Sequence, residues 1–346
     1  MSLDDTIESV RLRMPAEWWP HAATWLSWPH NLRTWPELLV EAEQAMSAVV
    51  AALAPHEHVH INVQNASHRD HVAGLIAAVA PPERITLHPI ETDDAWIRDH
   101  GAVFVFSSDN ERIALDFDYN AWGGKYPPWE RDQAVACRMA EVLRASRRCP
   151  AMVLEGGSID VNGAGCLLTT EQCLLNSNRN PDMSRQQIEQ RLSEYLGAEE
   201  ILWLDRGIAG DDTDGHIDEF ARFVGETSIA IGVENDPSDI NFGILQENRE
   251  RLASLEIAGQ AVSLVDLPMP QPIFAGDQRL PASYANFYIA NEVVLLPVFS
   301  DPADAEAIAV LQQQFPTRRI VPIDARALIH GLGGIHCLTQ QVPAAS

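Results

Sequence analysis

Short strand-like runs dominate this chain, and their ratio to the helical segments most constrains its fold. The runs cover residues 23–28, 58–63, 84–90, 102–106, 112–117, 166–170, 172–176, 201–204, 221–224, 228–233, 261–265, 292–298 and 319–323. Helical patterns, with apolar residues three or four apart, cover residues 36–53, 130–144, 184–196 and 301–315. Roughly two or three strands per helix exceed the one-to-one alternation of a doubly wound sheet. The sequence therefore predicts an α/β fold built from repeated units of several strands and a helix.

The chain shows no internal boundary. Its 346 residues are 46% hydrophobic, and no low-complexity segment or Ser/Gly linker interrupts them, so we expect one domain over residues 1–346. The opening residues MSLDDTIESVRLR are acidic where a signal peptide would be basic, and no run approaches about 20 apolar residues. We expect a cytoplasmic protein with no membrane partner.

The formal charge of −25 limits the classes of ligand. Such a charge repels nucleic-acid phosphates and anionic lipids, and it concentrates cations near the protein. It favours a small cationic substrate and argues against a nucleic-acid partner. The alternative is an acidic surface that serves only solubility.

The five cysteines raise a separate question. Cys137, Cys149, Cys166, Cys173 and Cys337 form no CxxC motif and leave one residue over from any pairing, so they indicate neither a disulfide framework nor a zinc knuckle. Cys337 is unusual because it lies in the glycine-rich stretch GLGGIHCLTQQ, near the end of the chain. Its local sequence leaves three interpretations open: a buried thiol, a metal ligand or a nucleophile.

The chain carries no nucleotide-binding motif, and its candidate metal ligands lie in one acidic stretch. GLGGIH lacks the GxGxxG spacing, and no GxxxxGK[ST] motif occurs. The DDTDGHIDE stretch offers oxygen and imidazole ligands, but a calcium loop centred on Gly215 would need acids where Gly210 and Ala221 stand. A zinc or manganese site remains an alternative; its candidate ligands are Asp211, Asp212, Asp214, His216 and Asp218.

Three further motifs carry groups suited to catalysis. In GHIDEF, His216 and Asp218 would share one face of an extended strand. In DDAWIRDHG, Trp96 and Asp99 precede a turn glycine, and LEGGSI offers Glu155 before two glycines. Surface charge or helix capping is the alternative for each motif taken alone.

Read together, six ordered motifs between about residues 13 and 343 resemble one family. They are MPAEWWPHAATWLSWP, TDDAWIRDHG, DFDYNAWGGKY, LEGGSI, DDTDGHIDEF and GGIHCLTQQ. The chain is similar to the agmatine deiminases, which belong to the guanidine-modifying (pentein) superfamily together with bacterial peptidylarginine deiminases. The resemblance implies a five-bladed, pseudo-symmetric α/β propeller with its active site on the central axis. It also implies a homodimer.

The resemblance assigns the reactive positions. A guanidinium is a delocalised cation whose carbon must be held, polarised and attacked by a strong nucleophile. Asp99 and Asp218 match the pair that grips guanidinium nitrogens, and His216 matches the general acid and base. Cys337 matches the nucleophile that forms a covalent thiouronium. The implied chemistry requires no metal and no organic cofactor.

Several neighbouring residues receive weaker assignments. Glu155 matches an acid beside the catalytic histidine, although a strand-end turn would also explain it. Trp96 and Trp122 match apolar walls of the site, or they belong to the core. Gly333 and Gly334 would let the backbone approach the substrate. On an extended chain His336 would point away from Cys337, so it is not expected to act as the base.

The resemblance also sets the functional alternatives. Agmatine, which would give N-carbamoylputrescine and ammonia, is the substrate that best suits an acidic chain. A peptidylarginine deiminase or another guanidine deiminase is the second interpretation. The third is a noncatalytic protein that binds guanidines or metals on the same scaffold. Leu332 departs from the glycine-rich run of the family, which puts the shape of the pocket rim in question.

Overall fold

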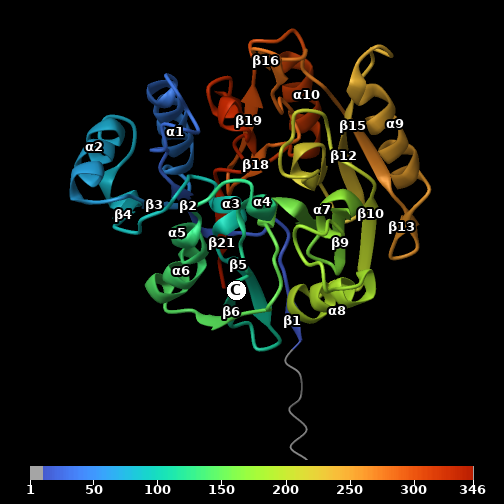
Figure 1. Cartoon of the computed structure of the whole chain (residues 1–346), viewed down its shortest axis with the longest axis horizontal. Helices are drawn as coiled ribbons and strands as arrows, with labels where there is room; N and C mark the ends of the chain where they lie inside the picture. The colour runs from blue at the N-terminus through green and yellow to red at the C-terminus, as the bar shows by residue number, and fades with distance from the viewer. Residues whose placement is uncertain (1–10, 346) are drawn as a thin grey trace, which may run out of the picture.

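The computed structural model describes residues 11–345 and contains five sheets of three or four strands, joined by helices. Figure 1 shows the five groups arranged around the middle of the molecule, where α3 (Ile97–His100) and α4 (Ala121–Gly124) lie. Two short hairpins complete the strand set: β13 (Glu256–Ile257) with β14 (Gln260–Ala261), and β16 (Phe274–Ala275) with β17 (Gln278–Arg279).

Four of the five sheets follow the chain in order. The second contains β1 (Leu12–Arg13), β5 (Val103–Ser107), β6 (Arg112–Leu115) and β7 (Ser146–Arg148). The third contains β8 (Ile159–Val161), β9 (Cys166–Thr170) and β10 (Glu200–Leu204). The fourth contains β11 (Ala221–Phe223), β12 (Ser228–Val233) and β15 (Ser263–Pro268), and the fifth contains β18 (Tyr288–Ile289), β19 (Val293–Val298) and β20 (Arg319–Asp324).

These four sheets share one plan. An antiparallel strand pair is followed by a helical crossover and then by a strand parallel to the second. Parallel strands run in the same direction, so the end of one strand and the start of the next lie at opposite edges of the sheet. The chain must therefore cross over between them. The main crossover helices are α6 (Val135–Leu143), α8 (Arg185–Leu196), α9 (Ile240–Ala253) and α10 (Asp304–Gln314).

The first sheet reaches the same plan by joining the two ends of the chain. Its order is β21-β2-β3-β4, formed by β2 (His21–Ser27), β3 (His58–Asn62), β4 (Ile85–His88) and β21 (Gln340–Pro343). The helix α1 (Leu39–Leu53) connects β2 to the parallel β3, and α2 (Ala66–Ile76) connects β3 to β4. The antiparallel neighbour of β2 is β21, from the C-terminal end. This pairing carries Cys337 from the end of the chain to the first sheet.

Local sequence explains where the helices begin and end. The Ser184 side chain accepts from the Gln187 N–H, and the Gln187 side chain caps the Ser184 N–H in return, so α8 begins with a capping box. Its buried residues Ile188, Leu192 and Leu196 recur every four positions along one face. The helix ends at Leu196, and the next residue, Gly197, caps it with a left-handed φ of 72°, a conformation that favours glycine.

Most of the predicted elements are confirmed, and two differ. Residues 172–176, expected as a strand, begin within α7 (Glu171–Leu174) because the Thr170 hydroxyl caps the Cys173 N–H. A short apolar run does not separate the two states by periodicity alone. The helix expected over 130–144 is divided into α5 (Glu130–Gln133) and α6.

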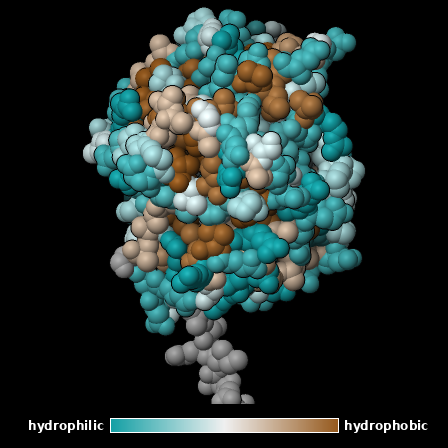
Figure 2. All heavy atoms as spheres, turned by 90° about the vertical axis from the view of Figure 1, so that its left-hand side faces the viewer, coloured by the Kyte–Doolittle hydropathy of each residue, from teal (hydrophilic) through white to brown (hydrophobic). Residues whose placement is uncertain are grey.

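One face of the molecule is mostly polar (Figure 2). Figure 2 shows a largely hydrophilic face with separate apolar areas between polar side chains. Among residues 11–345, no helix is both long and apolar enough to cross a membrane.

Candidate active site

A cavity of about 430 Å³ lies where loops from several sheets meet, and it contains the sulfur-bearing residue Cys337 in its wall. Five of its lining residues are aspartates, whereas Arg33 is the one lining arginine among the described residues. The aspartates are Asp93, Asp94, Asp99, Asp132 and Asp212. Trp96 and Trp122 also line the cavity. The volume suits a small molecule, and the excess of carboxylates suits a cation.

Asp99 is held at the cavity by the single turn α3. Its Oδ2 accepts a hydrogen bond from the Trp122 indole N–H at 3.0 Å, and its Oδ1 accepts from the Gly157 N–H at 3.0 Å. The backbone of Trp122 is left-handed, with φ of 55°, a strained conformation for an aromatic residue. Trp122 therefore orients Asp99 as well as lining the cavity.

Gly157 marks the point where three predicted site residues converge. A Cβ atom there would lie 2.6 Å from His216 Nδ1, 2.8 Å from Asp99 Oδ1 and 3.0 Å from Asp218 Oδ2. Any side chain at this position would collide with all three groups. The second glycine of LEGGSI is therefore required by the close approach of the His216, Asp99 and Asp218 side chains.

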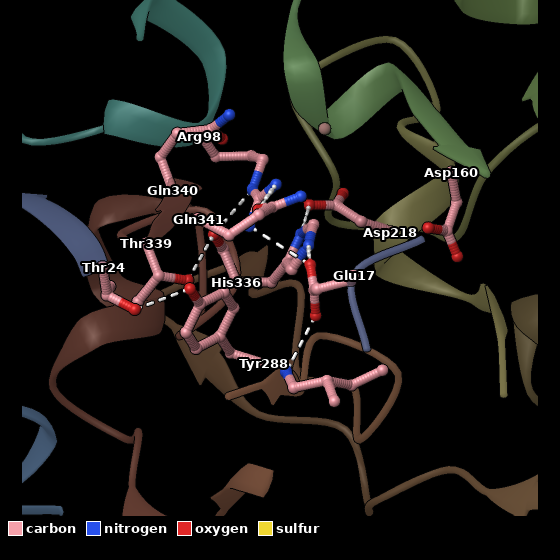
Figure 3. Close-up of polar contacts among 12 residues, drawn as sticks. Glu17, Thr24, Arg98, Asp160, Asp218, Tyr288, His336, Thr339, Gln340 and Gln341 are labelled. Carbon is pink, nitrogen blue, oxygen red and sulfur yellow. Dashed lines mark hydrogen bonds and ion pairs between the residues drawn. The ribbon is translucent and has the colours of Figure 1, made fainter. Parts of the chain in front are cut away.

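A buried series of polar contacts, from Glu17 through His336, holds the Asp218 side chain in place (Figure 3). His336 places Nδ1 2.6 Å from Asp218 Oδ2 and Nε2 2.7 Å from Glu17 Oε2. Glu17 also forms ion pairs with Arg98 at 3.3 Å and Arg222 at 3.0 Å. Asp218 Oδ1 has no hydrogen-bond partner within residues 11–345, which leaves it able to accept from a ligand.

Two local expectations are corrected here. His216 and Asp218 do not lie on an extended strand, because η3 (Ile217–Glu219) is a 3-10 turn that begins after His216. The chain at His336 is a turn rather than an extended segment, since the Leu338 N–H bonds the Ile335 carbonyl. His336 nevertheless directs both ring nitrogens to carboxylates.

His216 lies at the back of the site beside two further buried groups. Its ring, the Cys173 thiol and the Glu155 carboxylate have atoms within 4.8 Å of one another, and Nδ1 is 3.7 Å from Asp99 Oδ1. Neither ring nitrogen forms a hydrogen bond within the described part of the chain. Glu155 is not a surface turn residue: it is fully buried, and its Oε1 accepts from Arg179 Nε at 2.6 Å.

Charge interactions shift the proton affinities of these groups. Burial alone would lower the pKa of His216, but Asp99, Cys173 and Glu155 raise it well above its usual value. Burial raises the pKa of Asp99, and Asp218 and Glu155 add to this shift. Although burial opposes it, the His336 hydrogen bond lowers the pKa of Asp218. Asp99 and Asp218 therefore differ in basicity within one site.

Cys337 is the most strongly affected thiol of the site. Burial raises its pKa well above the usual value, and Asp218, Glu219 and Asp99 raise it further. Burial and the neighbouring carboxylates therefore disfavour the thiolate. The backbone N–H of Gly334 opposes the shift.

The glycine-rich loop after η4 (Leu328–Gly331) shapes the cavity rim. Gly333 lines the cavity, and a Cβ there would lie 2.5 Å from the Trp96 ring. Gly334 is not among the cavity-lining residues; a Cβ there would meet Asn286 Oδ1 at 2.5 Å. Leu332 takes a left-handed φ of 72°, the conformation that favours glycine. The left-handed backbone at Leu332 is therefore strained, because this chain has leucine where the family resemblance leads one to expect glycine.

The predicted Asp and His metal ligands do not converge as one set. Asp211 accepts from the Gly215 and His216 backbone N–H groups, and Asp214 pairs with Lys125 and Arg179. Two other groups have three ligand atoms each within 4.8 Å: Glu155, Cys173 and His216, and Asp218, Glu219 and Cys337. We assign neither as a metal site, because N–H donors of Arg179, His336 and Asn286 already occupy atoms in these groups.

Several residues that contact the predicted site were not predicted from the sequence. Glu219, Asn286 and Glu17 were not singled out, and His336 was considered only as a base. Glu219 follows Asp218 directly, which was the available signal, but adjacent acids are also typical of a surface. Asn286 lies outside the six motifs, so no local pattern identifies it. Glu17 lies within MPAEWWPHAATWLSWP, but far along the chain from the motifs that carry the reactive groups.

The chain is similar to known proteins in both sequence and structure. Residues 13–343 match the family model of the Porphyromonas-type peptidyl-arginine deiminases. An agmatine deiminase from Ectopseudomonas mendocina is 39% identical, covering 99% of this chain and 98% of its own. The structure of an Enterococcus faecalis agmatine deiminase superposes with a TM-score of 0.91 at 31% identity, covering 97% of this chain and 96% of its own.

A further solved structure is a cysteine-to-serine variant of a C. jejuni agmatine deiminase with substrate bound. It has a TM-score of 0.89 and 31% identity, covering 96% of this chain and 97% of its own. An amidinotransferase from Microseira wollei, at 13% identity and a TM-score of 0.53, shares the fold alone. The expected α/β fold is confirmed. The chain belongs to the Porphyromonas-type peptidyl-arginine deiminase family, together with its agmatine deiminase relatives.

Proposed function

We propose that this chain is an agmatine deiminase that converts agmatine to N-carbamoylputrescine and ammonia. The observation that carries the proposal is that Asp99, Asp218 and His216 converge at Gly157, while Asp99 and Cys337 line an acidic cavity beside them. The E. mendocina and E. faecalis relatives are agmatine deiminases, which supports it.

The proposed mechanism follows from the charges of the site. Asp99 and Asp218 accept hydrogen bonds from the guanidinium nitrogens and hold the cation in place. The sulfur of Cys337 attacks the guanidinium carbon, the C–N bond to ammonia breaks, and a thiouronium remains. His216 protonates the leaving amine and then activates water, which displaces the sulfur. Glu155 stabilises the charged imidazole. We propose that these steps use no metal or organic cofactor.

The cavity favours agmatine over the alternative guanidines. Agmatine ends in an ammonium, which the excess of lining carboxylates would attract. Free arginine carries an α-carboxylate, which they would repel. A peptidylarginine would need room for its flanking residues, whereas a cavity of about 430 Å³ has the volume typical of a small-molecule site. The apolar faces of Trp96 and Trp122 would contact the methylene chain. Gly334 would assist by its N–H group beside the sulfur rather than by lining the cavity.

A comparison of substrates tests the proposal. Ammonia release is measured with agmatine, arginine and a blocked peptidylarginine at equal concentrations. We expect kcat/KM to be highest for agmatine by at least about 100-fold, since one misplaced charge costs roughly 3 kcal/mol. Preference for peptidylarginine would replace agmatine with the second candidate. Binding of agmatine without any ammonia release would favour a noncatalytic guanidine-binding protein.

We also propose the finer architecture implied by the resemblance. The shared plan of the five sheets supports a five-bladed α/β propeller that forms one catalytic domain over residues 1–346. A homodimer in the cytoplasm is proposed as well, and the exposed side chains of Leu32 and Val40 are apolar groups that an interface could cover. Light scattering would give the mass; a monomeric mass at micromolar concentration would contradict the dimer.

A further inference from the structure

Glu219 lies directly behind the sulfur of Cys337. Its Oε1 is 3.4 Å from Cys337 Sγ and accepts from Asn286 Nδ2 at 3.1 Å. The same Asn286 Nδ2 is 3.2 Å from the sulfur. Glu219 is 1% exposed, and its Oε2 has no hydrogen-bond partner among residues 11–345. One amide therefore bridges a thiol and a buried carboxyl group that touch each other.

No other group of the site is equally placed to take the thiol proton. His216 forms no hydrogen bond with Cys337 within the described residues. Asp218 Oδ2 is 3.8 Å from the sulfur, and that oxygen already accepts from His336 at 2.6 Å. Glu219 Oε1 is thus the closest carboxylate oxygen with a hydrogen bond from the thiol.

The position of the cavity makes the pair asymmetric. Cys337 lines the cavity, whereas Glu219 is not among the lining residues. A cation in the cavity therefore lies closer to the sulfur than to the Glu219 carboxylate, so it stabilises negative charge more strongly on sulfur. Its arrival shifts the balance from thiol and carboxylate toward thiolate and carboxylic acid.

The charges around the pair make Glu219 a strong proton acceptor. Burial raises its pKa well above the usual value, with further contributions from Asp218 and Asp211, while the hydrogen bond from Cys337 and the charge of His216 act in the opposite direction. Asp218, Glu219 and Asp99 also raise the pKa of the Cys337 thiol. A proton between the two groups is therefore retained by the protein instead of being released to solvent.

We propose that Glu219 is a further catalytic residue, which takes the thiol proton of Cys337 when a guanidinium enters the cavity. This inference rests on the proposed deiminase function. The S–H bond breaks, and its electron pair stays on sulfur to form the S–C bond with the guanidinium carbon. The proton forms an O–H bond on Glu219. When water displaces the sulfur, the S–C electron pair returns to sulfur and Glu219 gives the proton back.

Ligand binding to the unmodified protein provides the first test. Acetamidinium presents the planar N–H groups of a guanidinium, and thiolate formation is followed by its ultraviolet absorbance. A pH indicator in weakly buffered solution records proton release. We expect thiolate absorbance to rise with far less than one proton released per thiolate. Release of one proton per thiolate would overturn the assignment of Glu219.

The Glu219→Gln variant provides the second test, because the amide keeps the shape of the side chain but cannot take the proton. We expect kcat to fall by about 100-fold or more with KM for agmatine within a few-fold. Alkylation of Cys337 by a haloacetamidine should slow in parallel. Glu43→Gln is the matched control: Glu43 is also buried and accepts from Trp28 and His71, so it should retain normal kcat.

The outcomes separate this inference from the proposed function. An unmodified protein that does not act on agmatine would contradict the function itself. Normal kcat and normal alkylation in Glu219→Gln, with an active unmodified protein, would contradict only the role of Glu219. If Glu219→Gln does not fold, the proton-release measurement on the unmodified protein decides.

Discussion

His336 bridges two buried carboxylates, with Nδ1 2.6 Å from Asp218 Oδ2 and Nε2 2.7 Å from Glu17 Oε2. Both ring nitrogens therefore face carboxylate oxygens, the groups that accept hydrogen bonds from a ring N–H. Asp218 Oδ1 remains without a partner among the described residues. The bridge therefore fixes one oxygen of Asp218, and the proposed mechanism assigns the other oxygen to the guanidinium.

Replacing His336 should remove the contact that holds the Asp218 side chain in position. In His336→Gln the side chain cannot reach both carboxylates, so we expect KM for agmatine to rise about tenfold and the free energy of unfolding to fall by roughly 1–3 kcal/mol. Steady-state kinetics and denaturant unfolding measure the two effects. Unchanged KM and unchanged stability would show that the bridge has no role in positioning Asp218.

Neutralising either carboxylate of the grip should remove most turnover. Asp99→Asn and Asp218→Asn each replace a charged acceptor with a neutral amide that faces a cation, and we expect kcat/KM to fall by about 100-fold or more. Asp236→Asn, at an exposed position, is the control for charge removal alone. Near-normal activity in both site variants would be incompatible with the proposed grip.

Cys337 should react slowly with neutral alkylating agents. Its raised pKa keeps the thiol protonated at neutral pH, so its rate with iodoacetamide should rise only as pH climbs toward that pKa. Exposed Cys149 serves as an internal control in the same protein. Peptide mass spectrometry should find Cys149 labelled first by iodoacetamide and Cys337 labelled first by a cationic haloacetamidine. Rapid labelling of Cys337 by iodoacetamide at neutral pH would contradict the shift.

Acid should weaken the fold through Glu17. Burial would raise the pKa of Glu17, but Arg222, His336 and Arg98 lower it well below its usual 4.5. The ionised carboxylate therefore stabilises the fold fully above the unfolded pKa, and this stabilisation is lost as pH falls through the folded pKa. We expect Glu17→Gln to reduce stability at neutral pH and to flatten its decline below about pH 4.5. Equal pH slopes in the variant and the unmodified protein would refute this expectation.

Chelation tests the metal alternative. Prolonged dialysis against a chelator should leave ammonia release from agmatine unchanged, because the proposed attack uses sulfur, carboxylates and imidazole only. Activity that is lost on dialysis and restored by zinc or manganese would revive the metal interpretation of the Asp and His cluster.

Sequence patterns predicted the repeated strand and helix units because periodicity reports local burial. They did not identify β21, since QQVP has no apolar alternation and becomes a strand only by pairing with β2. Similarly, Cys337 and Asp99 were recognised from compact motifs, whereas Glu17 and Asn286 reach the site through long-range packing. The strand assigned to residues 172–176 was wrong because the Thr170 cap, a single hydroxyl, favours a helical turn there.

The most direct test is the mass of the protein during turnover. Protein mixed with agmatine is quenched in acid within the first turnovers, and its peptides are mapped by mass spectrometry. We expect the peptide that contains Cys337 to gain the mass of agmatine less ammonia, and Cys337→Ser to show neither adduct nor ammonia. An adduct on Cys137, Cys149, Cys166 or Cys173, or full ammonia release by Cys337→Ser, would contradict the assignment of Cys337 as the nucleophile.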